Sequence, residues 1–279
     1  AAPPSSGGVA MIQMLNMLSD YDFDALSDSE QVHLLAEVMR RAYRDRAEFL
    51  GDTDYVEVPV NRLTSKQYTN KLASTSRMDE ATPSSKLSPV VVDAVKAADT
   101  THFSIVDIEG NRVAATLSIN YPFGSCFVAE GTGVLLNDEM DDFSSKPGQP
   151  NAYGLVGAEA NAIEPGKRML SSMTPTFLET KDRIAVLGTP GGSRIITMVL
   201  LATLEFHNGG SADDMVNRAR FHHQYLPDKI FFEPGVLTET LIKTLFELGH
   251  EAEMLDSTYG NMHAIVMDKK SRQLDAASD

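Results

Sequence analysis

The stretch D-T-T-H-F-S-I-V-D at residues 99–107 decides the fold, because the character of the chain changes there. Residues 102–107 and 112–119 alternate apolar with polar positions and are rich in β-branched side chains. E-G-N at residues 109–111 separates them, so the pair predicts a β-hairpin. Residues 74–88, just upstream, are rich in serine, threonine and charge and predict a mobile segment. A mobile polar segment that runs into a strand is what a cleavage junction would look like.

Helices are predicted upstream of this junction. Residues 9–18 carry apolar side chains at helical spacing. Ser27 is followed three residues later by Glu30, which is a capping-box pattern. Apolar positions then repeat every three or four residues, and Gly51 supplies a stop signal. We therefore expect a helix over 9–18 and a long amphipathic helix over 28–50.

Strands and helices are mixed downstream of the junction. An apolar strand is predicted at 184–187, followed by the turn G-T-P-G-G at 188–192 and a helix over about 193–207. The other predicted elements are helices at 212–220 and 237–248 and strands at 230–233, 262–268 and 272–276. This order favours a layered α+β fold over a regular doubly wound sheet.

Length and charge exclude several classes of protein. The 279 residues allow one large domain or two small ones. Lys and Arg number 24 against 39 Asp and Glu, and the net charge of −15 argues against nucleic acid and anionic lipid as partners. No apolar run reaches the ~18 residues that a membrane span needs. The single cysteine, Cys126, excludes an internal disulfide, and we expect it to be packed.

Thr100 and Thr101 place two hydroxyl groups directly before the predicted strand. The simpler interpretation is a loop capped by threonines. The alternative needs Thr100 to become a chain N-terminus. A free α-amino group has a pKa of about 7.7–8.0 and could take the proton from the hydroxyl of its own residue. These residues alone leave both interpretations open.

The turn at Gly188–Ser193 joins a predicted strand to a predicted helix. Its glycines allow a tight turn and can present backbone N–H groups to an anion. It could be a simple turn, a phosphate cradle or an oxyanion hole. No lysine follows the glycines, as a phosphate loop would require, so an oxyanion hole is the preferred functional interpretation.

Three further polar clusters have less specific patterns. Ser171 and Ser172 are typical of turn capping. Glu139 and Asp142 belong to an acidic loop that could bind a cation or could simply be solvated. The pair at residues 222–223, two adjacent histidines, has no third ligand at convincing spacing, so zinc is disfavoured.

Taken together, several motifs resemble those of the γ-glutamyltranspeptidases in their order and spacing. They are Thr100–Asp107, Gly124, Leu135–Ser144, Lys146–Gly154, Lys167–Thr176, Gly188–Ile195 and Arg220–Leu226. The resemblance covers essentially all of residues 100–279, and residues 3–50 resemble the last part of the family's large subunit.

This resemblance implies an α+β fold, namely an αββα four-layer sandwich of the N-terminal-nucleophile hydrolase type. Residues 1–99 would be the C-terminal part of the large subunit, helical and then mobile. Residues 100–279 would be the small subunit. The precursor of this family cuts itself, here between Asp99 and Thr100. The family's large subunit is much longer than 99 residues, so we expect this chain to be a fragment and the sandwich to be incomplete.

The resemblance also implies γ-glutamyl transferase and glutathione hydrolase activity. Thr100 would attack the γ-amide carbonyl of glutathione or another γ-glutamyl compound and form an ester. Water, or an amino acid or dipeptide acceptor, would then receive the γ-glutamyl group. Gly191 and Gly192 match the oxyanion-hole pair. Ser118 stands where the family usually has a second threonine that supports the nucleophile. No metal and no organic cofactor are implied.

The substrate-binding roles carry over by position. Ser171 and Ser172 match hydroxyls that hold the substrate α-carboxylate. Tyr153 matches a loop tyrosine that some members use to cover the site. The group that holds the substrate α-ammonium is matched by Asn120, Glu139 and Asp142. The family's arginine for the α-carboxylate has no counterpart here, because its motif is not matched by any of the helix arginines, Arg40, Arg41, Arg44 and Arg46.

The remaining expectations concern partners and location. After cleavage the large and small subunits would form a heterodimer. The resemblance implies a periplasmic or extracellular location, although residues 1–8 do not have the pattern of a signal peptide. Two alternatives stay open. One is a related acylase of the same fold, such as a cephalosporin acylase or a poly-γ-glutamate-processing enzyme. The other is an inactive truncated fragment.

Overall fold

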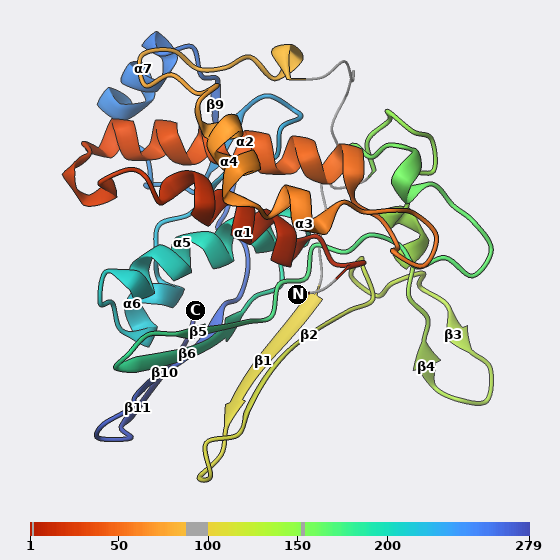
Figure 1. Cartoon of the computed structure of the whole chain (residues 1–279). Coiled ribbons are helices and arrows are strands. Elements are labelled where there is room, and N and C mark those ends of the chain that lie inside the picture. Colours follow the sequence, from red (N-terminus) through yellow and green to blue (C-terminus); the bar gives the residue numbers. More distant parts are fainter. Residues whose placement is uncertain (2, 88–99, 152–153) are drawn as a thin grey trace.

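The computed structural model describes residues 1, 3–87, 100–151 and 154–279. Its helices lie above an antiparallel sheet, and a long β-hairpin lies below that sheet (Figure 1). One large apolar core joins the helices to the upper face of the sheet. The candidate site lies at one end of the hairpin, where loops that join the layers come together.

The upper layer is built on two helices with strong sequence signals. They are α1 (Gly7–Leu18) and α2 (Asp28–Phe49). The capping box at Ser27 is present, with the Glu30 side chain and the Ser27 side chain each accepting from the other's backbone N–H. Both helices bury much of their surface, and α1 packs against α2 and against the helix α5 (Ile195–His207). The expected helices at 9–18 and 28–50 are therefore confirmed.

The sheet has four antiparallel strands in the order β11-β10-β6-β5. Their bounds are β5 (Thr176–Glu179), β6 (Arg183–Gly188), β10 (His263–Asp268) and β11 (Leu274–Ser278). Strand β6 is buried from Ile184 to Gly188 because α5 covers one face and the hairpin covers the other. The glycine turn then leads directly from the sheet into α5 through η5 (Gly192–Arg194).

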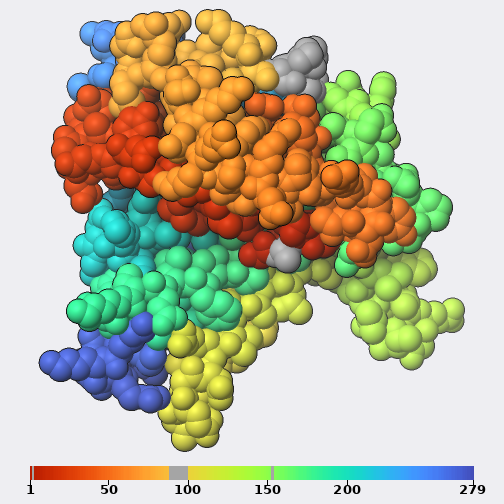
Figure 2. All heavy atoms as spheres, viewed as in Figure 1, coloured from red at the N-terminus to blue at the C-terminus, as the bar shows by residue number. Residues whose placement is uncertain are grey.

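The hairpin pairs β1 (Thr100–Val106) with β2 (Arg112–Ser118), with Thr100 opposite Ser118. Its inner face packs on β6 and β10, where His102 is buried. Its outer face carries exposed Phe103 and Ile105. Figure 2 shows that the hairpin, in yellow, projects from the body of the molecule. Within the described residues no helix covers this outer face, so three of the four expected layers are present.

Smaller elements complete the chain. A three-stranded sheet contains β7 (Phe221–His222), β8 (Ile230–Phe232) and β9 (Ala252–Met254), and a two-stranded one contains β3 (Val128–Ala129) and β4 (Val134–Leu135). The short α-helices are α3 (Val60–Leu63), α4 (Lys66–Ala73), α6 (Ala212–Val216) and α7 (Glu239–Glu247). The remaining 3-10 turns are η1 (Phe23–Ala25), η2 (Ser84–Lys86), η3 (Glu139–Asp142) and η4 (Glu159–Asn161).

Several local features differ from the sequence-based expectation. The helix expected at 212–220 ends at Val216, and the strand expected at 272–276 runs over Leu274–Ser278. Helices α3 and α4 lie in a region with no predicted helix, and α4 begins because the Ser65 side chain accepts from the Tyr68 N–H. Cys126 is exposed rather than packed, because it lies in a turn with a positive φ of 57°. Among the described residues, no helix has the length and apolar character to span a bilayer.

The described part of the segment before the junction is held by hydrogen bonds. The Thr82 N–H and hydroxyl both donate to the Glu37 carboxylate, at 3.0 and 2.6 Å. The Ser84 hydroxyl donates to the Tyr225 carbonyl at 2.7 Å. Residues 88–99, which include Asp99 of the expected cleavage site, lie outside the described residues.

Candidate active site

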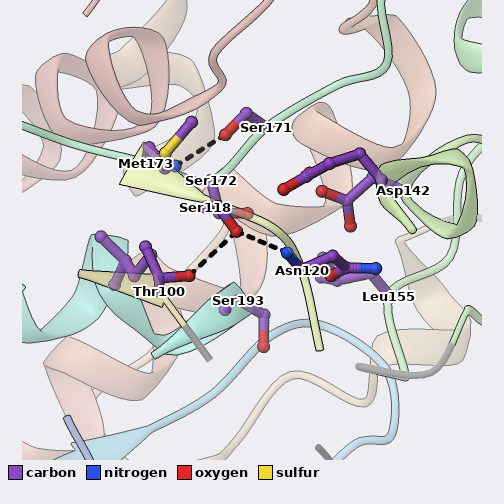
Figure 3. A pocket seen from close by; sticks show the side chains of 12 residues that line it. Thr100, Ser118, Asn120, Asp142, Leu155, Ser171, Ser172, Met173 and Ser193 are labelled. Atoms are coloured by element: carbon purple, nitrogen blue, oxygen red, sulfur yellow. Dashed lines mark hydrogen bonds between the residues drawn. The ribbon is translucent and has the colours of Figure 1, made fainter. Parts of the chain in front are cut away.

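The hairpin register brings the expected nucleophile to a second hydroxyl. The Thr100 Oγ1 donates to the Ser118 Oγ at 3.2 Å. The backbone N–H of Asn120 donates to the same Ser118 oxygen at 2.9 Å (Figure 3). Both lone pairs of this oxygen are therefore used, and Ser118 keeps its own proton to donate elsewhere. Asn120 is buried and has a positive φ of 72°, a conformation that asparagine tolerates better than most residues.

Thr100 and Ser118 line a pocket of about 310 Å³ that is partly open to solvent. Four separate segments converge on it: the start of the hairpin, the acidic turn η3, the serine segment before β5, and the glycine turn before α5. Its full lining is Thr100, Ser118, Asn120, Glu139, Asp142, Leu155, Ser171, Ser172, Met173, Gly192, Ser193 and Ile195. A concave site with several convergent polar groups is the usual form of a small-molecule site.

One side of the pocket is acidic. Burial raises the pKa of Asp142 to about 7, and the neighbouring Glu139 carboxylate adds to this effect. The pKa of Glu139 is also raised, mainly by burial. The buried Oε1 of Glu139 has no hydrogen-bond partner. Two close carboxyl groups, one with an unsatisfied oxygen, would gain from a cationic ligand because it would neutralise their mutual repulsion.

The opposite side of the pocket presents hydroxyl groups. The Met173 N–H donates to the Ser171 Oγ at 3.0 Å, and the Arg46 Nη2 donates to the Ser172 Oγ at 3.1 Å. Each serine oxygen therefore accepts from the protein and retains a proton that it can donate. In Figure 3 the Ser171 hydroxyl is turned toward Met173, and Asp142 lies on the far side of Ser171 from Met173. The pocket thus has a donor side and an acidic side.

The glycine turn supplies backbone donors. Gly191 and Gly192 both have positive φ, 139° and 57°. A Cβ on Gly191 would come within 2.5 Å of the Met198 terminal methyl, which could move aside, so it is the positive φ of 139° that requires glycine there. Among the residues that the structure describes, neither N–H group donates a hydrogen bond to another residue. They are available to a developing negative charge at the start of α5.

The structure brings most of the predicted site residues together. The pocket lining includes Thr100, Ser118, Asn120, Glu139, Asp142, Ser171, Ser172 and Gly192. Gly191 is the chain neighbour of Gly192 but does not itself line the pocket. Tyr153, the predicted lid residue, lies outside the described residues, as does Asp99. The roles assigned to these residues stay predictions, since the structure shows their positions only.

Sequence reasoning missed two polar residues at this site. Ser193 lines the pocket, and its hydroxyl donates to the Gln224 Oε1 at 2.7 Å. Arg46 lies behind Ser172 and is buried. Both positions were visible in the sequence, Ser193 beside the glycines and Arg46 at the end of the long helix. No spacing rule connects a helix arginine to a serine that lies 126 residues away.

The adjacent histidines have structural partners. His222 Nδ1 lies 2.8 Å from the Thr197 Oγ1, and His223 Nε2 lies 3.1 Å from the Asp228 Oδ1. Burial lowers the pKa of His222 to about 3 and that of His223 to about 4, so both are neutral at pH 7. Over residues 1, 3–87, 100–151 and 154–279, no group of three or more His, Cys, Asp or Glu side chains is placed to hold a metal ion.

Helices over a sheet, a second β layer below, and a threonine at the first position of a hairpin strand define an N-terminal-nucleophile hydrolase fold. The sequence model for gamma-glutamyltranspeptidase matches residues 1–279, and the chain belongs to that family. It is 42% identical over 269 residues to the glutathione hydrolase proenzyme of Escherichia coli K12, covering 95% of this chain and 46% of that protein. It is 43% identical to the same-named protein of Pseudomonas aeruginosa, covering 99% of this chain and 50% of that protein. The chain therefore spans about half the length of these relatives.

Solved structures agree. An acivicin-inhibited γ-glutamyltranspeptidase is 40% identical with a TM-score of 0.60, over 64% of this chain and 96% of that chain. The γ-glutamyltranspeptidase of Pseudomonas nitroreducens complexed with L-DON is 46% identical with a TM-score of 0.59, over 64% of this chain and 94% of that chain. A cephalosporin acylase of Bacillus halodurans shares the fold, with a TM-score of 0.77 over 100% of this chain and 48% of that chain at 18% identity. The predicted fold and family are confirmed.

Proposed function

We propose that this chain carries the catalytic half of a γ-glutamyl transferase and glutathione hydrolase whose nucleophile is Thr100. The observation that supports the proposal most is the position of the Thr100 hydroxyl. It lies at the first residue of β1, bonded to Ser118, in a pocket with one acidic and one hydroxyl side. The relatives at 42–43% identity are named glutathione hydrolase proenzymes.

The proposed chemistry begins with cleavage of the peptide bond before Thr100. This frees an α-amino group whose ordinary pKa of about 7.7–8.0 suits a general base. The amine takes the hydroxyl proton of Thr100 as Oγ1 forms a bond to the γ-carbonyl carbon of the substrate. The carbonyl oxygen becomes an oxyanion that the N–H groups of Gly191 and Gly192 stabilise. The leaving amine then takes the proton and departs, and a γ-glutamyl ester remains on Thr100.

The second half of the cycle repeats these steps with a new nucleophile. Water or an acceptor amine loses its proton to the α-amino group as it attacks the ester carbonyl. Collapse of the oxyanion breaks the ester bond and returns the proton to Thr100. Attack by water gives hydrolysis to glutamate, and attack by an amine gives transfer. Before each acylation Ser118 holds the Thr100 hydroxyl in place.

The two sides of the pocket fit the zwitterionic end of a γ-glutamyl group. Glu139 and Asp142 would pair with the α-ammonium, which also neutralises the repulsion that raises the pKa of Asp142. Ser171 and Ser172 would donate to the α-carboxylate. Cleavage would leave the two parts of the chain associated as a heterodimer, because α2 and α5 share one apolar core. We also propose a periplasmic or extracellular location, which cell fractionation would test.

The proposal is tested with the full-length protein and γ-glutamyl-p-nitroanilide. Thr100→Ala is expected to abolish cleavage before residue 100 and to reduce anilide hydrolysis to background. Thr101→Ala is the matched control, because this exposed neighbour lies on the same strand and outside the pocket. It is expected to give two subunits by mass spectrometry and near-normal turnover. Equal turnover by the wild type and Thr100→Ala would contradict the proposal.

A related acylase activity is the second candidate, because this chain is 34% identical to acylase ACY 1 proenzymes of Pseudomonas over 94% of its length. The acidic side of the pocket distinguishes the two. A γ-glutamyl enzyme needs Glu139 and Asp142 to hold an α-ammonium, whereas an acylase for substrates without that group does not. Unchanged γ-glutamyl turnover in a Glu139→Ala and Asp142→Ala double variant would favour the acylase.

A further inference from the structure

Arg46 is a buried cation whose contacts lead to the wall of the pocket. It lies in the last turn of α2 and is 5% exposed. Its Nε donates to the Ser6 Oγ at 3.0 Å, and its Nη2 donates to the Ser172 Oγ at 3.1 Å. The rigid fork of the guanidinium therefore joins the start of α1, the end of α2 and the serine segment at one point.

These contacts fix the direction of the serine hydroxyls. A guanidinium can only donate hydrogen bonds, so both serine oxygens must accept from Arg46. The Ser6 hydroxyl then donates a hydrogen bond to the Ser171 carbonyl at 2.7 Å. The Ser6 N–H donates to the same carbonyl at 2.8 Å. Ser172 lines the pocket, and its hydroxyl makes no hydrogen bond as a donor to another described residue. Its proton is therefore available to a ligand.

The charge of Arg46 is opposed in the protein by Asp142, but only from beyond ion-pair distance. Within the described residues, no carboxylate lies within 4.0 Å of its guanidinium. By contrast, Arg40 and Arg41 on the same helix both pair with Glu37. An unpaired buried charge is costly, and such charges in proteins are generally paired or bound to a ligand. A ligand anion hydrogen-bonded to Ser172 would place a second negative charge near Arg46, in addition to Asp142.

We propose that Arg46 is a positioning residue that makes this side of the pocket select a carboxylate. It orients the Ser172 hydroxyl toward the ligand, strengthens that hydroxyl as a donor, and supplies positive charge from behind it. The inference rests on the proposed function, because the carboxylate is the α-carboxylate of the γ-glutamyl group. The pocket then carries positive charge on one side and negative charge on the other, in the order that a zwitterionic α-amino acid requires.

The test uses three amides that differ only at the α-carbon substituents. L-Glutamine carries both charged groups, glutaramate lacks the α-ammonium, and 4-aminobutanamide lacks the α-carboxylate. Each is used to inhibit hydrolysis of γ-glutamyl-p-nitroanilide by the mature full-length enzyme. Arg46→Gln is expected to weaken inhibition by L-glutamine and glutaramate about 10- to 100-fold, the range for loss of a charge-assisted hydrogen bond. Inhibition by 4-aminobutanamide is expected to change less than about threefold.

Arg44→Gln is the matched control, because Arg44 lies on the same helix and bonds to Glu48 at 3.1 Å, away from the pocket lining. It is expected to leave all three inhibition constants within about threefold. Equal weakening of the three amides by Arg46→Gln would show a general structural role and would overturn the inference. So would unchanged inhibition by L-glutamine. If the wild type hydrolyses no γ-glutamyl anilide, the proposed function itself is wrong.

Arg46→Lys keeps the test decisive if Arg46→Gln does not mature. Lysine retains the charge and donors but lacks the planar fork that reaches Ser6 and Ser172 together. We expect it to restore cleavage and part of the selectivity for the α-carboxylate. If neither variant is cleaved before residue 100 while Arg44→Gln is, then Arg46 serves folding or maturation and the inference is overturned.

Discussion

The middle and the C-terminal end of helix α2 carry buried charges whose surroundings differ. In its middle, Glu37 pairs with Arg40 and Arg41 and also accepts two hydrogen bonds from Thr82; we call these four residues the paired cluster. At its end, Arg46 makes no ion pair within 4.0 Å among the described residues but acts electrostatically on Asp142, which Glu139 also influences; we call Arg46, Glu139 and Asp142 the pocket charges. One helix therefore contributes both to a satisfied network and to an unsatisfied one.

The pKa values express this difference. Burial alone would raise the pKa of Glu37, but Arg40, Arg41 and the Thr82 hydrogen bonds hold it below its usual value. Burial raises the pKa of Asp142 to about 7, and the nearby charge of Arg46 only partly opposes this. Satisfied charges stabilise the folded state, whereas unsatisfied ones leave interaction energy available for a ligand. The paired cluster should therefore control stability and the pocket charges should control activity.

The largest expected effect comes from breaking the paired cluster. Glu37→Gln is expected to lower the free energy of unfolding by about 3–5 kcal/mol, because it removes the charge that two buried guanidinium groups share. The wild-type contribution is present above a pH of about 4.5 and is lost as the pH falls through the lowered pKa of Glu37. Urea unfolding at pH 7 and at pH 3.5 measures both effects.

Glu48→Gln is the control for this prediction. Glu48 pairs with Arg44 at i, i+4 on the same helix, but its side chain is 44% exposed. Its loss is expected to cost at most about 0.5 kcal/mol. A Glu37→Gln variant that is no less stable than Glu48→Gln would show that the paired cluster does not stabilise the fold.

Substitution of a pocket charge should lower activity rather than stability. Asp142→Asn is expected to lower kcat/KM for a γ-glutamyl anilide about 10- to 100-fold, because a charge-assisted hydrogen bond to the α-ammonium is lost.

The raised pKa of Asp142 means that the folded state binds an extra proton between a pH of about 4 and about 7. The contribution of Asp142 to the free energy of unfolding therefore falls as the pH rises through that window. In the Asp142→Asn variant this pH-dependent loss of stability is expected to disappear. Thermal unfolding midpoints of the wild type and of Asp142→Asn at pH 5 and pH 8 measure this loss of stability. An Asp142→Asn variant that is less stable than the wild type at pH 8 would contradict this account.

The sequence predicted the parts of this arrangement that depend on local pattern. Strand alternation and the E-G-N turn at 109–111 predict the hairpin that places Thr100 opposite Ser118. The capping box at Ser27 and Glu30 predicts the start of α2. The family motifs then name the residues on both sides of the pocket, and the structure places all of these except Tyr153 around one space.

The remaining features depend on contacts between distant segments. Periodicity identifies the buried face of α2 but not what lies against it, so the bond from Arg46 to Ser172 cannot be read from the helix. Helix α4 begins at a single serine cap within a polar stretch. Its buried residues are Thr69 and Leu72 alone. Such a pattern is too weak to predict from sequence, and tertiary packing stabilises it.

A smaller effect is expected from the influence of Glu139 on the pKa of Asp142. Glu139 is the second cause, after burial, of the raised pKa of Asp142. Glu139→Gln is therefore expected to lower that pKa, so that L-glutamine keeps its inhibition to a lower pH than in the wild type. The measurement is the inhibition constant of L-glutamine from pH 5 to pH 8. Glutaramate is the control, because without an α-ammonium it does not need the ionised carboxylate, and a parallel shift for both ligands would refute this interpretation.

The smallest effect is expected at Ser118, which touches the nucleophile but carries no charge. Its oxygen accepts from the Thr100 hydroxyl at 3.2 Å and from the Asn120 N–H at 2.9 Å. Ser118→Ala removes a neutral acceptor and is expected to lower kcat about 3- to 10-fold with little change in KM. Ser118→Thr keeps the oxygen and adds a methyl group that restricts its rotamer, so it should match or exceed the wild type. If the threonine variant loses as much activity as the alanine variant, then the space around residue 118, rather than its hydroxyl, is what supports Thr100.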